Sequence, residues 1–261
     1  MVWAVIPVKR LESVKQRLAK ELSPEGRKRL YLAMLFDVLD SLVQTPSIKG
    51  ISVVTPDSQV EAIVCSYQTD VHIIKETGSP SLNGALRQAA RSLQKSGVTH
   101  MLVVPGDLPL LKPDEVGQIV ACSSLASVII VPDKTWSGTN GLLLKLPTSI
   151  RLSFGPNSFQ AHLMQARTRG VSNRVCPLPS LSWDIDHFAD LTSVIENGRG
   201  TKTYQEMLRQ GIYRYFIHAH QRNKSVRERK VLKPMGRFNL SMKQENASPA
   251  CSRDSGRRHS R

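Results

Sequence analysis

The stretch VWAVIPVKRLESVKQRL, residues 2–18, begins as an apolar segment and then becomes strongly basic. Its first seven residues include three valines and an isoleucine, so the pattern predicts a buried strand over residues 2–8. Residues 9–18, which follow that strand, contain no glycine, but they contain four cationic side chains: Lys9, Arg10, Lys15 and Arg17. Cations directly after a buried strand indicate a ligand with several phosphates, and a solvated turn followed by the exposed face of a helix is the plain alternative.

The rest of the chain alternates between short apolar runs and helical patterns. Strands are predicted at 2–8, 50–56, 70–76, 100–107, 127–133 and 141–146. Several of these runs are apolar at successive residues, as expected for strands that are buried on both faces. Helices are predicted at 23–43, 79–97 and 112–124. This alternation predicts an α/β sandwich with a mostly parallel central sheet.

Local signals mark the ends of two of these helices. Ser23 is expected to be the N-cap of the first helix, with Pro24 at its first position. Gly97 follows the second helix, where a glycine commonly ends the helical conformation.

The charge of the chain is unevenly distributed. The 261 residues carry a net charge of +15, and 40% of them are hydrophobic, enough for a substantial core. Residues 217–261 hold twelve Lys/Arg and three Asp/Glu, a charge of +9, which leaves +6 for residues 1–216. We therefore expect a domain over 1–216 and a basic, disordered tail over 217–261. Weak contact between this tail and polyanions, including nucleic acid, stays open.

Other sequence features narrow the class of protein. The four cysteines form no CxxC pair, which argues against a disulfide framework or a zinc site. No signal peptide is evident, and no apolar run has the roughly 18 residues that a membrane span requires. We therefore expect a cytoplasmic protein without a membrane partner. The sequence does not indicate the oligomeric state.

Carboxylates form a second group of candidate site residues. In α/β sheets, ligands bind beyond the carboxyl ends of the strands, and Asp107 stands at the carboxyl end of the predicted strand 100–107. Asp184 and Asp186, two residues apart in an extended segment, would point to the same side. Their repulsion calls for a cation, and Mg²⁺ is the natural candidate for oxygen ligands. The plain alternatives are a turn cap for Asp107 and a helix N-cap for Asp186.

Further polar residues also lie near the expected strand ends. Thr55, Asp57 and Asn83 are placed to meet the base and ribose of a nucleotide. A hairpin turn is the plain reading of residues 138–140. His162 lies on a predicted helix from which it could face the site.

Taken together, the motifs resemble the CofC/FbiD family of guanylyltransferases, which act in the biosynthesis of the deazaflavin coenzyme F-420. The resemblance covers residues 1 to about 197 and is carried in order by VVTPD, SLNGAL, VVPGDLPLL, PDKTWSGTNGLLL, FGPNSFQAH and WDIDHFADL, after the N-terminal segment. It implies a nucleotide-diphospho-sugar transferase (GT-A-like) fold. The basic tail lies outside it.

The resemblance also implies a reaction and a set of site residues. GMP would pass from GTP to the phosphate of 2-phospho-L-lactate, phosphoenolpyruvate or 3-phospho-D-glycerate, with release of pyrophosphate. A downstream transferase would then pass the activated unit to the deazaflavin precursor. The family's acceptor-binding positions match Thr139, Gly155 and Ser158, and its metal-binding carboxylates match Asp107, Asp184 and Asp186.

This chemistry fits the basic segment after the first strand. Related nucleotidyltransferases hold the triphosphate with a glycine-rich loop, and this chain has cations there instead. We expect Lys15 and Arg17 to be catalytic, with Asp107, and Lys9 to bind the nucleotide. On a helix Lys15 and Arg17 would face different ways, so one of them should face solvent. Two other classes stay open: a nucleotidyltransferase acting on a sugar phosphate or a molybdenum-cofactor intermediate, and a nucleic-acid-binding protein.

Overall fold

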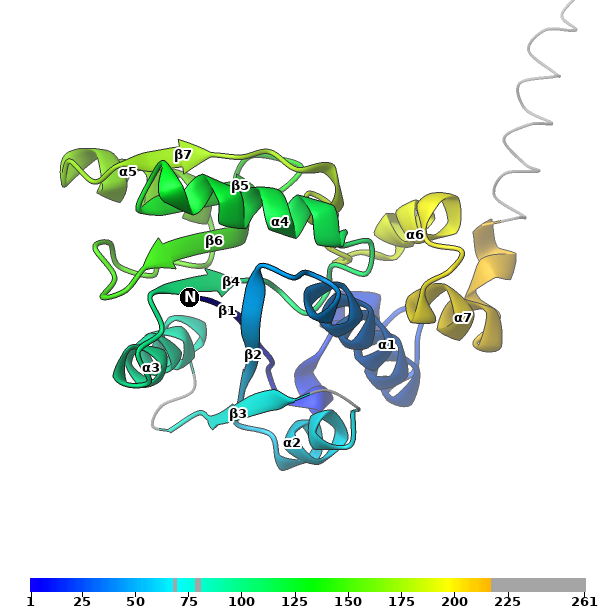
Figure 1. Ribbon diagram of the computed structural model, residues 1–261. Coiled ribbons are helices and arrows are strands. Elements are labelled where there is room, and N and C mark those ends of the chain that lie inside the picture. Colours follow the sequence, from blue (N-terminus) through cyan, green and yellow to red (C-terminus); the bar gives the residue numbers. More distant parts are fainter. Residues whose placement is uncertain (68–69, 78–80, 217–261) are drawn as a thin grey trace, which may run out of the picture. The chain divides into compact units, whose positions relative to one another are not determined.

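The computed structural model describes residues 1–67, 70–77 and 81–216, and these form a seven-stranded sheet with helices on both faces (Figure 1). The strands are β1 (Val2–Pro7), β2 (Ile48–Thr55), β3 (Val71–Lys75), β4 (His100–Val103), β5 (Val128–Pro132), β6 (Thr139–Lys145) and β7 (Asn173–Val175). They lie in the order β3-β2-β1-β4-β6-β5-β7, and β6 is antiparallel to both of its neighbours. The predicted α/β class with a mostly parallel sheet is confirmed.

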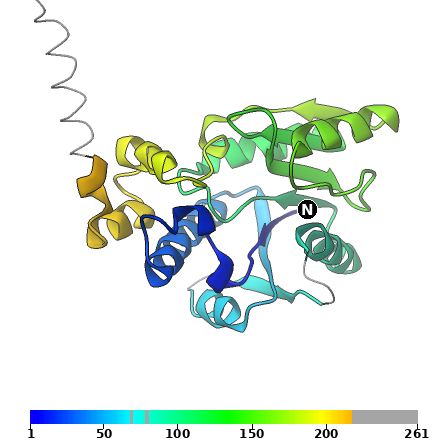
Figure 2. The same cartoon turned by 180° about the vertical axis from the view of Figure 1, so that it is seen from behind.

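Seven α-helices are present in the described part of the chain. They are α1 (Pro24–Val43), α2 (Ser58–Cys65), α3 (Leu82–Lys95), α4 (Pro113–Ala121), α5 (Ser158–Thr168), α6 (Leu191–Asn197) and α7 (Lys202–Arg209). Helices α1, α2 and α4 pack on one face of the sheet, and α3 and α5 pack on the other (Figures 1 and 2). Helices α6 and α7 bury Leu191, Val194 and Met207 against Leu30 and Met34 of α1.

The position of β1 in the sheet explains why its residues are almost all apolar. Ala4 and Ile6 point into the core beneath α1 and α2, and Val5 points into the core beneath α3. All three side chains are fully buried, as the run of successive apolar residues predicts. Strand β1 therefore lies inside the sheet, between β2 and β4, both of which run parallel to it.

The predicted helix ends are also confirmed. The hydroxyl of Ser23 accepts a hydrogen bond from the backbone N–H of Gly26 at 3.1 Å, and Pro24 is the first residue of α1. Gly97 follows α3 with a φ angle of +76°, in the left-handed region that favours glycine. Capping is local, so sequence alone placed these ends correctly.

Two loops that matter for function leave the sheet at the same edge. Because β1 and β4 are parallel neighbours, residues 8–18 after β1 and residues 104–112 after β4 both leave the carboxyl ends of their strands. The first loop contains two short 3₁₀ helices, η1 (Leu11–Ser13) and η2 (Gln16–Leu18), rather than an α-helix.

The predictions about membrane spans, cysteines and the C-terminal tail have different outcomes. None of the described helices is long and apolar enough to span a membrane. Cys65, Cys122 and Cys176 are free thiols, although Cys122 and Cys176 come within 3.6 Å despite their distance in sequence. The predicted tail, 217–261, lies outside the described residues, so the domain boundary at 216 stays a prediction.

Candidate active site

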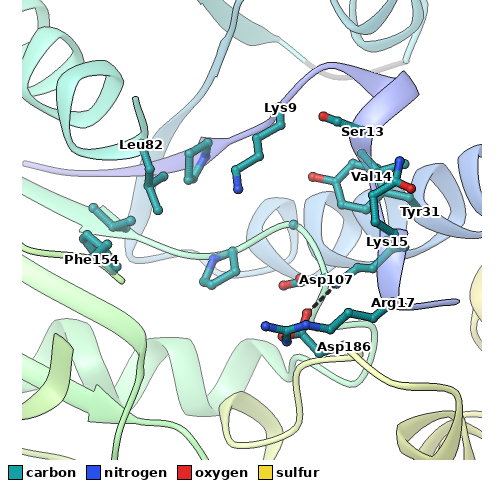
Figure 3. Close-up of a pocket in the computed structure, with 15 residues that line it drawn as sticks. Lys9, Ser13, Val14, Lys15, Arg17, Tyr31, Leu82, Asp107, Phe154 and Asp186 are labelled. Carbon is teal, nitrogen blue, oxygen red and sulfur yellow. Dashed lines mark hydrogen bonds and ion pairs between the residues drawn. The ribbon is translucent and has the colours of Figure 1, made fainter. Parts of the chain in front are cut away.

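A cavity of about 410 Å³ lies where the loops after β1 and β4 meet (Figure 3). Both loops and α1 line it, together with single residues from α3 and from the segments after β6 and β7. The lining residues are Pro7, Lys9, Ser13, Val14, Lys15, Gln16, Arg17, Tyr31, Leu82, Val103, Pro105, Gly106, Asp107, Phe154 and Asp186. Five predicted site residues are therefore brought together here: Lys9, Lys15, Arg17, Asp107 and Asp186.

Lys15 is the central cation of this cavity. Its side chain is only 6% exposed, and its Nζ lies 2.5 Å from Asp107 Oδ2 and 3.2 Å from Asp186 Oδ1. Burial lowers the pKa of Lys15, but the charges of Asp107 and Asp186 outweigh burial and raise the pKa above its ordinary value. Lys15 therefore stays charged and joins two carboxylates from distant parts of the chain.

The backbone at Lys15 explains how both basic side chains reach the same carboxylate. Lys15 has φ +49° and ψ +42°, a left-handed conformation that turns the chain between η1 and η2. Arg17 Nη1 then lies 2.5 Å from Asp186 Oδ2, and Lys15 reaches the other oxygen of that carboxylate. The helix expected here is not a continuous α-helix but two short 3₁₀ helices. The expectation that one cation faces solvent is confirmed, because the Arg17 side chain is 62% exposed.

Lys9 supplies a further positive charge at the cavity. It extends into the cavity from the end of β1 (Figure 3) and forms no ion pair with any described residue. Its ammonium group is therefore available to a ligand anion.

Of the two carboxylate oxygens of Asp107, only one has a partner among the described residues. Oδ2 pairs with Lys15, whereas the buried Oδ1 has no hydrogen-bond partner among the described residues. A buried carboxylate oxygen normally has a partner. Asp107 is thus equipped to bind one more donor or a cation.

Asp184 and Asp186 are tied to Asp107 but differ in their surroundings. The N–H of Ile185, between them, donates to the carbonyl oxygen of Asp107 at 3.1 Å. Asp184 accepts a hydrogen bond from Asn140 Nδ2 at 3.1 Å and does not line the cavity. Burial, reinforced by the charges of Asp107 and Asp186, raises the pKa of Asp184 despite that hydrogen bond.

These three carboxylates do not form a complete metal site by themselves. No group of three His, Cys, Asp or Glu side chains in the described ranges is arranged to hold a metal ion. The ammonium group of Lys15 lies between Asp107 and Asp186, where a cation would be expected. The unpaired Oδ1 of Asp107 and the hard oxygen donors are still suited to Mg²⁺.

The helix-cap alternative for Asp186 was wrong. The N-cap is His187, at the start of the 3₁₀ helix η5 (Phe188–Asp190), and Asp190 Oδ2 accepts hydrogen bonds from the backbone N–H groups of Asp186 and His187 at 3.0 and 2.7 Å. The carboxylate of Asp186 is left to Lys15 and Arg17.

The predicted acceptor residues lie on β6, at the start of α5 and in the loop before α5, and none of the three lines the cavity. Thr139 opens β6 and is 6% exposed; its Oγ1 lies 3.1 Å from Nδ1 of His162. Ser158 is the first residue of α5 and is also buried. Gly155 is exposed with φ +136°, a conformation that other residues rarely adopt. Phe154, which precedes Gly155 in the sequence, does line the cavity.

The hairpin turn lies before Thr139 rather than across residues 138–140. Asp133 Oδ1 accepts hydrogen bonds from the backbone N–H groups of Thr135 and Ser137 at 3.1 and 3.0 Å. Thr139 and Asn140 are consequently strand residues of β6.

The three residues expected at the base and ribose hold loops instead of lining the cavity. Thr55 Oγ1 accepts from the N–H of Asp57 at 3.1 Å. Asp57 Oδ2 accepts from the N–H of Leu11 at 2.8 Å, which fastens the basic loop. The amide of Asn83 donates to and accepts from the backbone of Phe154, at 2.9 and 2.8 Å. Contact between these three residues and a nucleotide stays a prediction.

Sequence reasoning missed Tyr31, which lines the cavity from α1. It sits one residue after the buried Leu30, so the helical pattern shows only that it lies near the core. A Cβ on Gly106 would lie 2.9 Å from the Tyr31 hydroxyl, which explains the glycine before Asp107. Burial and the charge of Asp107 raise the pKa of Tyr31, so it remains a neutral donor.

The sheet order and the charged edge define an α/β protein of the nucleotidyltransferase fold class. A protein from Desulfovibrio desulfuricans G20, described as a nucleotide-diphospho-sugar transferase, shares the fold with a TM-score of 0.68 and 17% sequence identity. The match covers 82% of this chain and 97% of that structure.

Sequence comparison shows the family. The family described as guanylyl transferase CofC like matches residues 2–229, and the chain belongs to this family of nucleotidyltransferase enzymes. The phosphoenolpyruvate guanylyltransferase of Nocardia farcinica is 37% identical, over 77% of this chain and 88% of that protein. The 2-phospho-L-lactate guanylyltransferase of Methanothermobacter thermautotrophicus is 35% identical, over 76% of this chain and 86% of that protein.

Proposed function

We propose that this enzyme transfers GMP from GTP to the phosphate of a small three-carbon phospho-acid and releases pyrophosphate. The observation that carries the proposal is the cluster of Lys15, Arg17, Asp107 and Asp186 at the cavity, in a chain of the guanylyl transferase family. Phosphoenolpyruvate, 2-phospho-L-lactate and 3-phospho-D-glycerate are the candidate acceptors. The first two are named in relatives of nearly equal identity, so similarity alone does not rank them.

The proposed step needs no protein base. An oxygen of the acceptor's phosphate forms a bond to the α-phosphorus of GTP. The bond from that phosphorus to the bridging oxygen breaks, and its electron pair leaves with pyrophosphate. Because a phosphate is already ionised near neutral pH, no proton has to be removed from the nucleophile. The protein's task is to align the two anions and to neutralise the charge that builds on the leaving group.

The cavity, together with the residues of β6 and the start of α5, offers groups for each part of this task. Lys9 and Arg17 reach the cavity as cations that can contact the triphosphate, and the buried Lys15 keeps Asp107 and Asp186 together. Thr139 and Ser158 bring hydroxyls to the acceptor side, and Gly155 leaves open space there for a small anion. The N-terminus of α5 adds a favourable dipole for that anion.

Magnesium is part of the proposal. Asp107, through its unpaired Oδ1, would hold the ion together with Asp184 and Asp186. When bound, Mg²⁺ supplies positive charge to the phosphates. Asn140 orients the Asp184 carboxylate, and the hydrogen bond from the N–H of Ile185 keeps that segment beside Asp107.

A nucleotide-by-acceptor matrix with pyrophosphate release as the readout tests the proposal. GTP, ATP, CTP and UTP are each combined with the three phospho-acids and with a sugar phosphate. We expect release with GTP and at least one phospho-acid, and none with Asp107→Asn under the same conditions. Release only with a sugar phosphate, or with none of the phospho-acids, would contradict it. We also propose, from family membership, that the product is used in coenzyme F-420 biosynthesis. A second transferase would consume it there.

A further inference from the structure

His162 has both of its ring nitrogens in use inside the protein. The residue lies on α5 and is fully buried. Its Nε2 lies 2.9 Å from the backbone nitrogen of Ser153, and its Nδ1 lies 3.1 Å from Thr139 Oγ1. Phe154 packs edge-on against the ring, with centroids 5.0 Å apart. The imidazole therefore connects the loop before α5 to the first residue of β6.

These partners determine which nitrogen carries the hydrogen. A backbone N–H can only donate, so Nε2 must accept from Ser153 and carry no hydrogen. Burial lowers the pKa of His162 to about 4, so the ring is neutral at physiological pH. The single ring hydrogen consequently sits on Nδ1 and points at the oxygen of Thr139.

This tautomer constrains the Thr139 hydroxyl. A hydroxyl that accepts from His162 still has its own hydrogen to donate, and no described residue accepts it. With the opposite tautomer, Thr139 would have to donate to the ring and would turn a lone pair toward an incoming anion. The hydrogen-bond chain from Ser153 through His162 thus decides the polarity that Thr139 presents.

We propose that His162 is a positioning residue that makes Thr139 an obligatory hydrogen-bond donor to the anionic acceptor. This inference rests on the proposed function, in which Thr139 belongs to the acceptor site. His162 does not touch the substrate, and it acts through Thr139. The loop that it grips is also held from α3, because the amide of Asn83 binds the backbone of Phe154. These contacts fix the position of the loop before α5 relative to the Thr139 hydroxyl.

Two substitutions separate this role from simple filling of space. His162→Asn keeps an amide donor near the position of Nδ1 and loses the acceptor for Ser153. His162→Gln extends to the position of Nε2, keeps an acceptor for Ser153 and loses the donor to Thr139. Gln is closer to His in volume, so a purely structural role makes His162→Gln the milder change. A positioning role makes His162→Asn the milder change for acceptor KM.

The main readout is KM for the acceptor, with KM for GTP and the unfolding temperature as internal controls. We expect His162→Gln to raise acceptor KM about tenfold or more, since a hydrogen bond to a charged group is lost or misdirected. KM for GTP should change little. In a Thr139→Val background, His162→Gln should add no further loss, because its effect passes through the hydroxyl. Independent, additive losses in the double variant would overturn the inference.

The tautomer itself can be read in the full-length wild-type chain by ¹⁵N NMR of the histidine ring. The expected spectrum shows a protonated Nδ1 and an unprotonated Nε2. A protonated Nε2 would refute the inference whether or not the variants fold.

The acceptor assignment can fail separately from this inference. If Thr139→Val leaves acceptor KM unchanged in an active enzyme, the proposed acceptor site is wrong. If Thr139→Val raises acceptor KM and His162→Gln does not, the acceptor site stands and the role of His162 is wrong.

Discussion

Replacing Lys15 by methionine removes the charge that joins Asp107 to Asp186 and keeps most of the side chain's length. The wild-type ammonium lies 2.5 Å from one carboxylate and 3.2 Å from the other, with 6% of the side chain exposed. Loss of one partner from a buried ion pair costs about 3–5 kcal/mol. Asp186 is 40% exposed and retains Arg17, so we expect a smaller loss of stability, about 2–3 kcal/mol.

This loss is measurable by thermal unfolding. For a domain of this size, about 2–3 kcal/mol corresponds to a decrease in Tm of roughly 5–10 °C. Because folding raises the pKa of Lys15 above 10.5, its stabilisation is fully present below that pH and is lost only as the pH rises through the raised pKa. The difference in Tm between wild type and Lys15→Met should therefore be the same at pH 7 and pH 9.

Lys15→Met should also lower turnover by about a hundredfold or more, since the proposed site loses the cation that keeps Asp107 and Asp186 together. Lys20→Met is the matched control, because Lys20 is an exposed lysine of the same segment that does not line the cavity. It should unfold and turn over like the wild type. A Lys15→Met protein with wild-type Tm and turnover would refute the view that Lys15 holds the carboxylates together.

Three further outcomes are expected. Asp186→Asn should lower turnover and raise the Mg²⁺ requirement, measured as pyrophosphate release against magnesium concentration; unchanged values would remove Asp186 from the site. Ser158→Ala should raise KM for the acceptor by about tenfold or more and leave KM for GTP unchanged; the reverse pattern would place Ser158 on the nucleotide side. A chain ending at Phe216 should fold, keep its turnover and bind less tightly to a polyanion column; a folded but inactive truncation would show that residues 217–261 complete the site.

Much of the fold follows from patterns that extend over a few residues. Ser23 and Pro24 define the start of α1 because the orphan N–H groups of a helix are satisfied within its first turn. The successive apolar residues of β1 predict burial on both faces because side chains alternate along a strand. The position of the site is also predictable, since loops after parallel neighbouring strands meet at one edge.

The use of each candidate residue depended on contacts that no local pattern contains. Lys15 is separated by 92 residues from Asp107 and by 171 from Asp186, and its left-handed backbone turns the chain between two 3₁₀ helices. Asp57 and Asn83 have the polarity of ligand-binding residues, yet they hydrogen-bond to the protein backbone, Asp57 to Leu11 and Gln59 and Asn83 to Phe154. The sequence does not distinguish a polar side chain that binds a ligand from one that binds the backbone of a loop.

The sequence by itself therefore determined the class of fold, the family and the edge of the sheet where the site lies. Only the tertiary structure decided that Lys15 pairs with two carboxylates, that His187 rather than Asp186 is the N-cap, and that His162 contacts Thr139. The physical reason is the distance along the chain over which each interaction acts. Helix caps and strand alternation arise from neighbours along the chain, whereas the partner of a buried charge or imidazole is whichever group the packed core brings within about 3 Å.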